Sequence, residues 1–164
     1  MDLVVLEEIK RLKYRYLRCV DTKDWSGLAD TLTVDATADY GTPTYGGPLH
    51  FEGREPLVAF LGENLGPGMV TTHFATHPEI EVDGGEAAGR WAFQDTVIAV
   101  RHRVVITGAA FYEDRYRLDD DGRWRIAHTG YERTYEAVFS LDDMPSFRLT
   151  ANRWPVEQVP NREG

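Results

Sequence analysis

Two side chains that lie far apart in the sequence, Asp21 and His73, have types and settings suited to proton transfer. Asp21 lies at the end of an amphipathic helical pattern, and His73 lies near the start of a strand-like stretch. When a carboxylate accepts the hydrogen of one imidazole nitrogen, the other nitrogen is left as a base that works within about a unit or two of neutral pH. If the fold brings the two together, the pair indicates abstraction of a proton next to a leaving group.

Asp95 and His128 are weaker candidates on residue type. Asp95 lies in a strand pattern that is otherwise mostly apolar. An inward carboxyl there would be a second proton-transfer group, an outward one would face an arginine, and the sequence favours neither. His128 shares a predicted strand face with Trp124 and Ile126, so we expect it in the core or in a pocket wall. His73 and His77, with Asp21 or Asp95, are possible metal ligands on residue type, but they lack the close helical spacing of convincing metal sites, and we expect no metal.

The composition excludes several classes of protein. At 164 residues with 42% hydrophobic residues, the chain fits one folded domain. A net charge of −9 argues against nucleic-acid binding, which needs clustered Lys and Arg. No apolar run approaches the length of a membrane span, and no signal-peptide pattern opens the chain, so we expect a soluble, cytoplasmic protein. No glycine-rich phosphate loop is present, and we expect no cofactor.

The elements that must position these side chains follow from periodicity. Apolar residues at helical spacing predict a helix over about residues 3–21 and a shorter one that carries Trp25, Leu28 and Leu32. A strand is expected over 36–40, and the loop 42–48, with two prolines and two glycines, is expected to be irregular. A third helix is expected from 55 or 56 to 64, closed by Gly66-Pro67-Gly68.

The second half of the chain reads as strands separated by turn residues. Four strands are expected, over about residues 70–82, 87–100, 104–118 and 123–136. Helices followed by a long antiparallel meander predict an α+β fold with helices packed on one face of a sheet, which curls to leave a pocket on its concave side. Residues 1–136 would form this domain. The tail, 137–164, is rich in apolar residues and is expected to dock over the pocket mouth or onto a neighbouring subunit.

Four segments together resemble a known superfamily: Val20–Trp25, Ala38–Tyr40, Thr72–Phe74 and Asp121–Ile126. They resemble the cone-shaped α+β superfamily of nuclear transport factor 2, ketosteroid isomerase and SnoaL-like proteins. The likeness is strongest to the branch that contains scytalone dehydratase, bile acid 7α-dehydratase and hexachlorocyclohexane dehydrochlorinase. The resemblance implies a curved mixed sheet with about three N-terminal helices on its concave side, and a homo-oligomer, with a trimer favoured and a dimer as the alternative.

The same resemblance assigns roles to individual residues. It implies that Asp21 and His73 form the catalytic dyad and that the Tyr40 hydroxyl helps to activate the leaving group. It also places Tyr112 and Asp114 among the polar residues that line the pocket. The chain departs from the pattern at Tyr16, where the dehydrochlorinase has a basic residue. It departs again at Thr129, where that enzyme has an arginine, and at Val97, near the place of a second histidine in scytalone dehydratase.

The leading functional interpretation is a cofactor-free lyase of the dehydratase type. Neutral His73 would remove a proton from a hydrophobic cyclic molecule, such as a polyketide, steroid or terpenoid intermediate of secondary metabolism, and water or a similar group would leave. Tyr40, Tyr16 and Tyr112 would supply hydroxyl donors, while Trp25 and Phe93 are expected in the core or the pocket wall. Two alternatives stay open: an isomerase or cyclase on the same scaffold, and a non-catalytic small subunit of a ring-hydroxylating dioxygenase.

Overall fold

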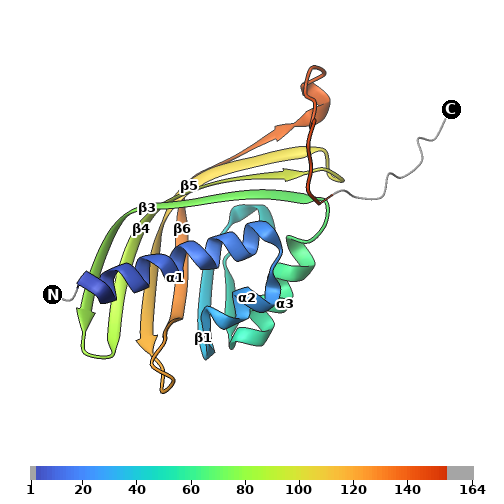
Figure 1. The fold of residues 1–164 in the computed structure, drawn as a ribbon. Coiled ribbons are helices and arrows are strands. Elements are labelled where there is room, and N and C mark those ends of the chain that lie inside the picture. The colour runs from blue at the N-terminus through green and yellow to red at the C-terminus, as the bar shows by residue number, and fades with distance from the viewer. Residues whose placement is uncertain (1–2, 155–164) are drawn as a thin grey trace.

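A curved sheet of six strands wraps around one long helix in the computed structural model, which describes residues 3–154 (Figure 1). The strand order is β2-β1-β6-β5-β4-β3. β1 and β6 pair in parallel and every other neighbouring pair is antiparallel, so the sheet is mixed. The strands are β1 (Leu32–Gly41), β2 (Leu49–Glu52), β3 (Met69–Asp83), β4 (Glu86–Ala99), β5 (Val104–Leu118) and β6 (Trp124–Ser140).

The described residues form three α-helices, and these cover the concave side of the sheet (Figure 1). They are α1 (Leu3–Thr22), α2 (Trp25–Asp30) and α3 (Arg54–Asn64). α1 forms because its apolar residues recur every three or four positions, and its buried face includes Ile9, Leu12 and Tyr16. It stops where Lys23 takes a left-handed backbone conformation with φ of 59°. This end of α1 lies against β3 and so carries Asp21 to the sheet.

Two bulges in β6 decide which of its side chains face the concave side. In the pairing with β5, Ala127 and Thr134 are the extra residues. Because side chains alternate along a strand, each extra residue exchanges the inner and outer faces of the strand beyond it. Trp124 and Ile126 therefore face inward before the first bulge, and the odd-numbered residues from 129 to 133 face inward after it. Beyond the second bulge, the inward residue is Glu136.

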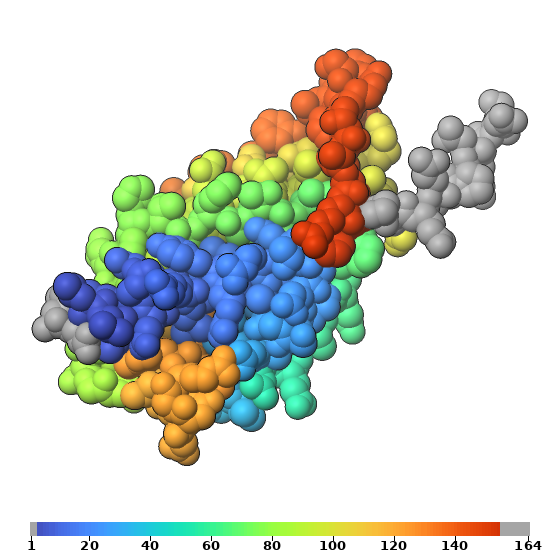
Figure 2. Space-filling model, in the orientation of Figure 1, coloured from blue at the N-terminus to red at the C-terminus, as the bar shows by residue number. Residues whose placement is uncertain are grey.

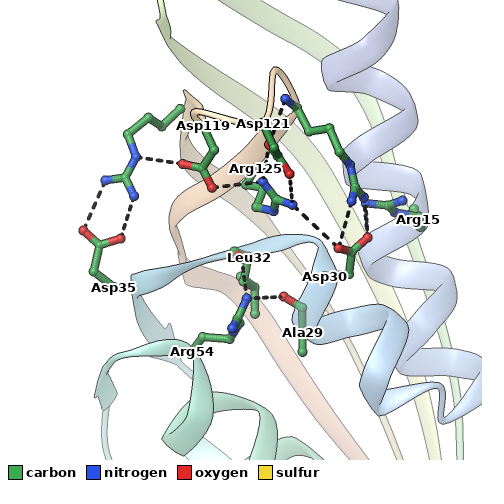
Figure 3. Close-up of polar contacts among 11 residues, drawn as sticks. Arg15, Ala29, Asp30, Leu32, Asp35, Arg54, Asp119, Asp121 and Arg125 are labelled. Carbon is green, nitrogen blue, oxygen red and sulfur yellow. Dashed lines mark hydrogen bonds and ion pairs between the residues drawn. The ribbon is translucent and has the colours of Figure 1, made fainter.

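Ion pairs fasten the turn between β5 and β6 to the helices (Figure 3). The carboxylate of Asp30, at the end of α2, contacts Arg15 of α1 as well as Arg123 and Arg125 of the turn region. Arg125 also binds Asp121 at 2.8 Å. Most of these side chains are partly exposed, so each ion pair contributes roughly 0–1 kcal/mol to stability. The main effect of the network is to hold the turn in place.

The predicted fold class is confirmed, with differences at the ends of elements. β1 begins at Leu32, which the apolar pattern had assigned to the second helix. The edge strand β2 was not predicted, because four residues are too few to show an alternation. Within the loop expected to be irregular, Pro43–Tyr45 form one short 3₁₀ helix, η1. β6 continues to Ser140, beyond residue 136. No helix in the described part of the chain is long and apolar enough to cross a membrane.

The chain after β6 stands out from the body of the protein before it turns back (Figure 2). A short 3₁₀ helix, η2 (Leu141–Asp143), begins this segment, and Leu141 is buried. Phe139 and Met144 are 48% and 41% exposed. Docking of the tail over the pocket or onto a neighbouring subunit stays a prediction, as does a domain limit at 136, and residues 155–164 lie outside the described residues.

Candidate functional site

Asp21 and His73 lie in direct contact, each held by a different element. Asp21 Oδ1 is 2.6 Å from His73 Nδ1, and the backbone N–H of His73 donates to Asp21 Oδ2 at 2.9 Å. An ionised carboxylate only accepts hydrogen bonds, so Nδ1 carries a hydrogen, and in the neutral imidazole Nε2 has the free lone pair. The side chains of His73 and Asp21 are 9% and 22% exposed. The arrangement leaves one imidazole nitrogen as a base in a mostly enclosed setting.

A third group completes the hydrogen bonding of this carboxylate. The Thr71 hydroxyl, two residues before His73 on the same face of β3, donates to Asp21 Oδ1 at 2.8 Å. Lys23 Nζ donates in turn to Thr71 Oγ1 at 3.2 Å. Burial lowers the pKa of Lys23 to about 8, against an opposing effect of Asp21. The carboxylate is thus oriented from three directions, which fixes the tautomer of His73.

His73 faces a cavity of about 540 Å³ on the concave side of the sheet. This volume is in the range of small-molecule sites. Its walls come from α1, η1, α3 and strands β1 to β6. The apolar and aromatic part of the lining includes Leu17, Val20, Phe60, Leu61, Leu65, Met69, Val97 and Ile106. Such walls suit a hydrophobic molecule. They also contain few groups that would compete with His73 for a proton.

Tyrosine hydroxyls line the same cavity. The hydroxyl oxygens of Tyr16 and Tyr40 are 2.5 Å apart, and Tyr131 shares a hydrogen bond of 2.6 Å with Thr42. Burial raises the pKa of Tyr16, Tyr40, Tyr112 and Tyr131, so all four stay protonated near neutral pH. Two hydroxyls that share one hydrogen bond keep one hydrogen free for a third oxygen. The Tyr16–Tyr40 pair can therefore donate to a ligand.

A buried ion pair forms another polar part of the wall. Arg133 Nη1 and Nη2 donate to the two oxygens of Asp95 at 2.7 and 2.8 Å. Arg133 Nε lies 3.4 Å from Glu136 Oε2, and Glu136 Oε1 accepts from the backbone N–H of Thr44 at 2.9 Å. The carboxyl of Asp95 is thus inward and also paired with an arginine, which combines the two alternatives that the sequence left open.

Beneath the cavity lies a second buried network. Lys13 Nζ is 2.8 Å from Asp114 Oδ2, with both side chains fully buried. Tyr116 donates to the same carboxylate at 2.7 Å, and Trp91 Nε1 donates to the Tyr116 hydroxyl at 2.9 Å. Burial lowers the pKa of Lys13 and the ion pair with Asp114 opposes that shift. Lys13 Nζ also sits 3.3 Å from the centre of the Tyr112 ring, so the network supports the cavity floor.

Most of the residues proposed from sequence surround the cavity. His73, Tyr40, Tyr16, Tyr112 and Asp95 line it. Phe93 lies just behind this surface, and its ring stacks on that of His73 with centroids 5.8 Å apart. Asp21 is held against His73 from behind.

Three further residues from the same set lie away from the cavity surface. Asp114 points into the network with Lys13, further along β5 than Tyr112. His128 faces the outer side of the sheet, where its Nδ1 is 2.8 Å from Thr37 Oγ1, because the bulge at Ala127 turns it away from the face of Trp124. Trp25 is partly buried and lies close to Gly62 of α3. These three side chains do not line the cavity, and their contact with a ligand stays a prediction.

Sequence reasoning missed Arg133, Glu136 and Tyr131, which line the cavity, and Thr71, which holds Asp21. Lys13 did carry a signal, since a lysine on the apolar face of a helix needs a buried partner. Among residues 3–154, no group of three or more His, Cys, Asp or Glu side chains is placed to hold a metal ion.

Several solved structures share the fold of this chain. A hexachlorocyclohexane dehydrochlorinase, LinA-type3 from Novosphingobium barchaimii LL02, superposes with a TM-score of 0.71 at 21% identity, over 84% of this chain and 91% of that chain. A proposed scytalone dehydratase from Novosphingobium aromaticivorans DSM 12444 gives 0.73 at 20% identity, over 82% and 87%. A variant of Rv3472, a protein of unknown function from Mycobacterium tuberculosis, gives 0.66 at 25% identity, over 90% and 79%.

At the level of sequence, the profile of the SnoaL-like domain matches residues 2–130. This span holds both partners of the Asp21–His73 contact and the Tyr16–Tyr40 pair, while Arg133 and Glu136 lie beyond it. The chain belongs to the SnoaL-like domain family.

Proposed function

We propose that this protein is a cofactor-free lyase of the dehydratase type, acting on a hydrophobic cyclic molecule. His73 is the base, Asp21 holds and stabilises it, and Tyr40 with Tyr16 protonates the leaving group. The observation that carries the proposal is the 2.6 Å contact between Asp21 and His73 Nδ1, with the imidazole facing a mostly apolar cavity. The fold is shared with a dehydrochlorinase and a proposed dehydratase, which makes this scaffold suited to eliminations.

In the proposed reaction, Nε2 of His73 takes a proton from a ring carbon. The electron pair of that C–H bond becomes the new C=C bond, and the C–O bond to the departing hydroxyl breaks. The free hydrogen of the Tyr16–Tyr40 pair goes to the departing oxygen, which leaves as water. The imidazolium returns its proton to the tyrosine pair through solvent once the product has left. Positioned proton transfer of this kind contributes about 10²–10⁴-fold to the rate.

An isomerase or cyclase is the second candidate, and one observation favours it. The Tyr16–Tyr40 pair, with oxygens 2.5 Å apart, can stabilise a developing enolate as readily as a departing hydroxide. The first step, removal of a C–H proton by His73, is common to both candidates. A supporting subunit of a dioxygenase receives less support, because such a subunit does not require an imidazole nitrogen held free in an open cavity.

Deuterium exchange tests the shared step, and product analysis separates the two candidates. Cyclic β-hydroxy ketones would be incubated with the protein in D₂O and followed by NMR. We expect exchange at a ring C–H together with an unsaturated product. Exchange with a rearranged product and no loss of water would favour the isomerase. His73→Gln and Asp21→Asn should abolish exchange, whereas Arg90→Gln, in an exposed pair with Glu113 on the outer face, should retain it. Equal exchange in wild type and both dyad variants would overturn the proposal.

We further propose that the outer face of the sheet joins copies of this chain into a homo-oligomer, with a trimer favoured. Phe74, Phe111 and Tyr135 are 61%, 54% and 48% exposed on that face. Phe74 and Tyr135 lie in one row across the strands, with Gln94 and Ala109 between them. Analytical ultracentrifugation of wild type and of Phe74→Glu/Phe111→Glu would test this. A wild-type monomer at micromolar concentration would refute it.

A further inference from the structure

Arg133 occupies a space that only a glycine on β5 leaves open. A Cβ on Gly108 would lie 2.9 Å from Arg133 Nη1 and 2.7 Å from the carbonyl oxygen of Tyr135. Without that side chain, the guanidinium crosses over β5 and reaches Asp95 on β4. The choice of glycine at this position is therefore tied to the placement of Arg133 over the concave face.

Strand register places this guanidinium in the same row as the proposed base. His73 pairs with Asp95, Asp95 with Gly108, and Gly108 with Glu136. The bulge at Thr134 lets both Arg133 and Glu136 face the cavity, although a regular strand would put residues three apart on opposite faces. Neighbouring strands are about 4.8 Å apart, so Arg133 over β5 lies roughly 10 Å from His73, which is the span of two or three fused rings.

The guanidinium has hydrogen-bond donors that no described residue uses. Arginine carries five N–H donors, and two of them bind Asp95. Nε faces Glu136 Oε2 at 3.4 Å, which is too long for a normal hydrogen bond. Within residues 3–154, Asp95 alone accepts a hydrogen bond from Arg133, so the second hydrogen on each Nη atom remains for a ligand.

The surrounding charges decide which kind of ligand oxygen can accept a hydrogen bond from these N–H groups. Two carboxylates, Asp95 and Glu136, face one guanidinium, and all three side chains are at most 7% exposed. The cluster therefore carries a net negative charge where solvent screens it little. An anionic group would meet repulsion from both carboxylates, whereas a carbonyl or hydroxyl oxygen would gain a charge-assisted hydrogen bond without that penalty. The other charged residues of the cavity wall, Glu63, Arg101 and His102, are exposed and screened.

We propose that Arg133 recognises an uncharged oxygen, as in a ring ketone, at the end of the substrate remote from the bond that His73 attacks. The substrate would then be a neutral fused-ring molecule with an oxygen at each end. The position of the oxygen relative to a reacting bond rests on the proposed function, whereas the preference of Arg133 for an uncharged oxygen does not. Binding of the remote end would hold the substrate ring in position next to His73. Binding energy from a part of the substrate that does not react can raise the reaction rate in this way.

A panel of three probes of similar shape tests the preference by isothermal titration calorimetry. The probes are 2-acetylnaphthalene, 2-isopropenylnaphthalene and 2-naphthoate, titrated into wild type and into His73→Gln. The variant has no base, so it separates binding from turnover and removes the imidazole as a partner for the carboxylate. We expect the ketone to bind about tenfold more tightly than the hydrocarbon in both proteins, as one charge-assisted hydrogen bond implies, and the carboxylate to bind most weakly.

Variants then assign the preference to Arg133. Arg133→Gln/Asp95→Asn removes the guanidinium together with the carboxylate that it binds, while Glu136 keeps its hydrogen bonds from Thr44. The double variant should erase the tenfold difference between ketone and hydrocarbon. Gly108→Ala, which displaces the guanidinium, should reduce the difference, and Arg90→Gln should keep it. The proposal is overturned if wild type binds the ketone no better than the hydrocarbon, if the carboxylate binds most tightly, or if the double variant still discriminates. In the last case, the Tyr16–Tyr40 pair is the donor that recognises the ketone oxygen. Loss of exchange activity in the dyad variants is a separate result, so the two proposals fail independently.

Discussion

Replacement of Asp21 by asparagine should remove the base without removing the fold. The carboxylate accepts three hydrogen bonds, from the Thr71 hydroxyl, the backbone N–H of His73 and His73 Nδ1. An amide has one oxygen and one NH₂ group. The backbone N–H cannot turn away, so the amide oxygen must stay opposite it and the NH₂ group then faces His73 Nδ1. The imidazole should respond by moving its hydrogen to Nε2, the nitrogen that faces the cavity.

The size of the effect follows from the loss of that lone pair. A positioned base contributes about 10²–10⁴-fold, which corresponds to roughly 3–5 kcal/mol of transition-state stabilisation. We expect kcat/KM to fall by this factor with little change in KM, because Asp21 lies behind His73 and does not line the cavity. Thr71→Val should cost less, since the carboxylate keeps both of its bonds to His73.

Two measurements check this reasoning. Steady-state kinetics would give kcat/KM for wild type, Asp21→Asn and the control Asp24→Asn, whose side chain caps α2 and where asparagine caps equally well. Nitrogen-15 NMR of the histidine ring would report its tautomer. Activity of Asp21→Asn within a few fold of wild type would refute the role of Asp21. Lost activity with the hydrogen still on Nδ1 would refute the tautomer explanation.

Three further predictions address Tyr40, the half-buried Lys23 and the buried Lys13. Tyr40→Phe should lower kcat by about tenfold, the loss of one hydrogen bond to a developing charge, and a change below twofold would remove Tyr40 from the mechanism. Because the pKa of Lys23 is lowered to about 8 from 10.5, the unfolded chain binds more protons between these values and stability should rise with pH across them. Urea unfolding of Lys23→Met at about pH 7.5 and about pH 10 should lack this component of the rise seen in wild type. Lys13→Met should cost about 3–5 kcal/mol of unfolding free energy by stranding the Asp114 carboxylate, whereas Lys13→Met/Asp114→Leu should recover much of that loss. Equal stability of these two variants would contradict the ion-pair argument.

The contact between Asp21 and His73 could be predicted because both positions follow from local patterns. The apolar period of α1 predicts which face of its last turn packs on the sheet. The resemblance of four short segments to the superfamily predicted that Asp21 on this turn pairs with His73 of β3. Asp95 was singled out by its carboxyl in an apolar strand, although its partner was not identified. Tyr16 and Tyr40 were both named, yet their mutual hydrogen bond depends on how α1 crosses β1.

Arg133, Glu136 and His128 could not be placed, because their orientation depends on pairing between β5 and β6. An extra residue in a strand leaves no local signature at Ala127 or Thr134, yet it reverses every side chain beyond it. The sequence alternation predicts one face for the whole strand. Only the register with β5 shows that Arg133 and Glu136 share a face and that His128 is excluded from it.

Because β3 is the last strand of the sheet that residues 3–154 form, its outer edge presents main-chain groups that bind no strand of this described part. The His73 amide is one of these, and it is held by Asp21. Its hydrogen should exchange with solvent at the rate at which the end of α1 lifts from the edge, faster than amides in β5 at the middle of the sheet. The exchange lifetime of this one amide therefore reports how often the base loses its partner in the folded protein, without any substrate in hand.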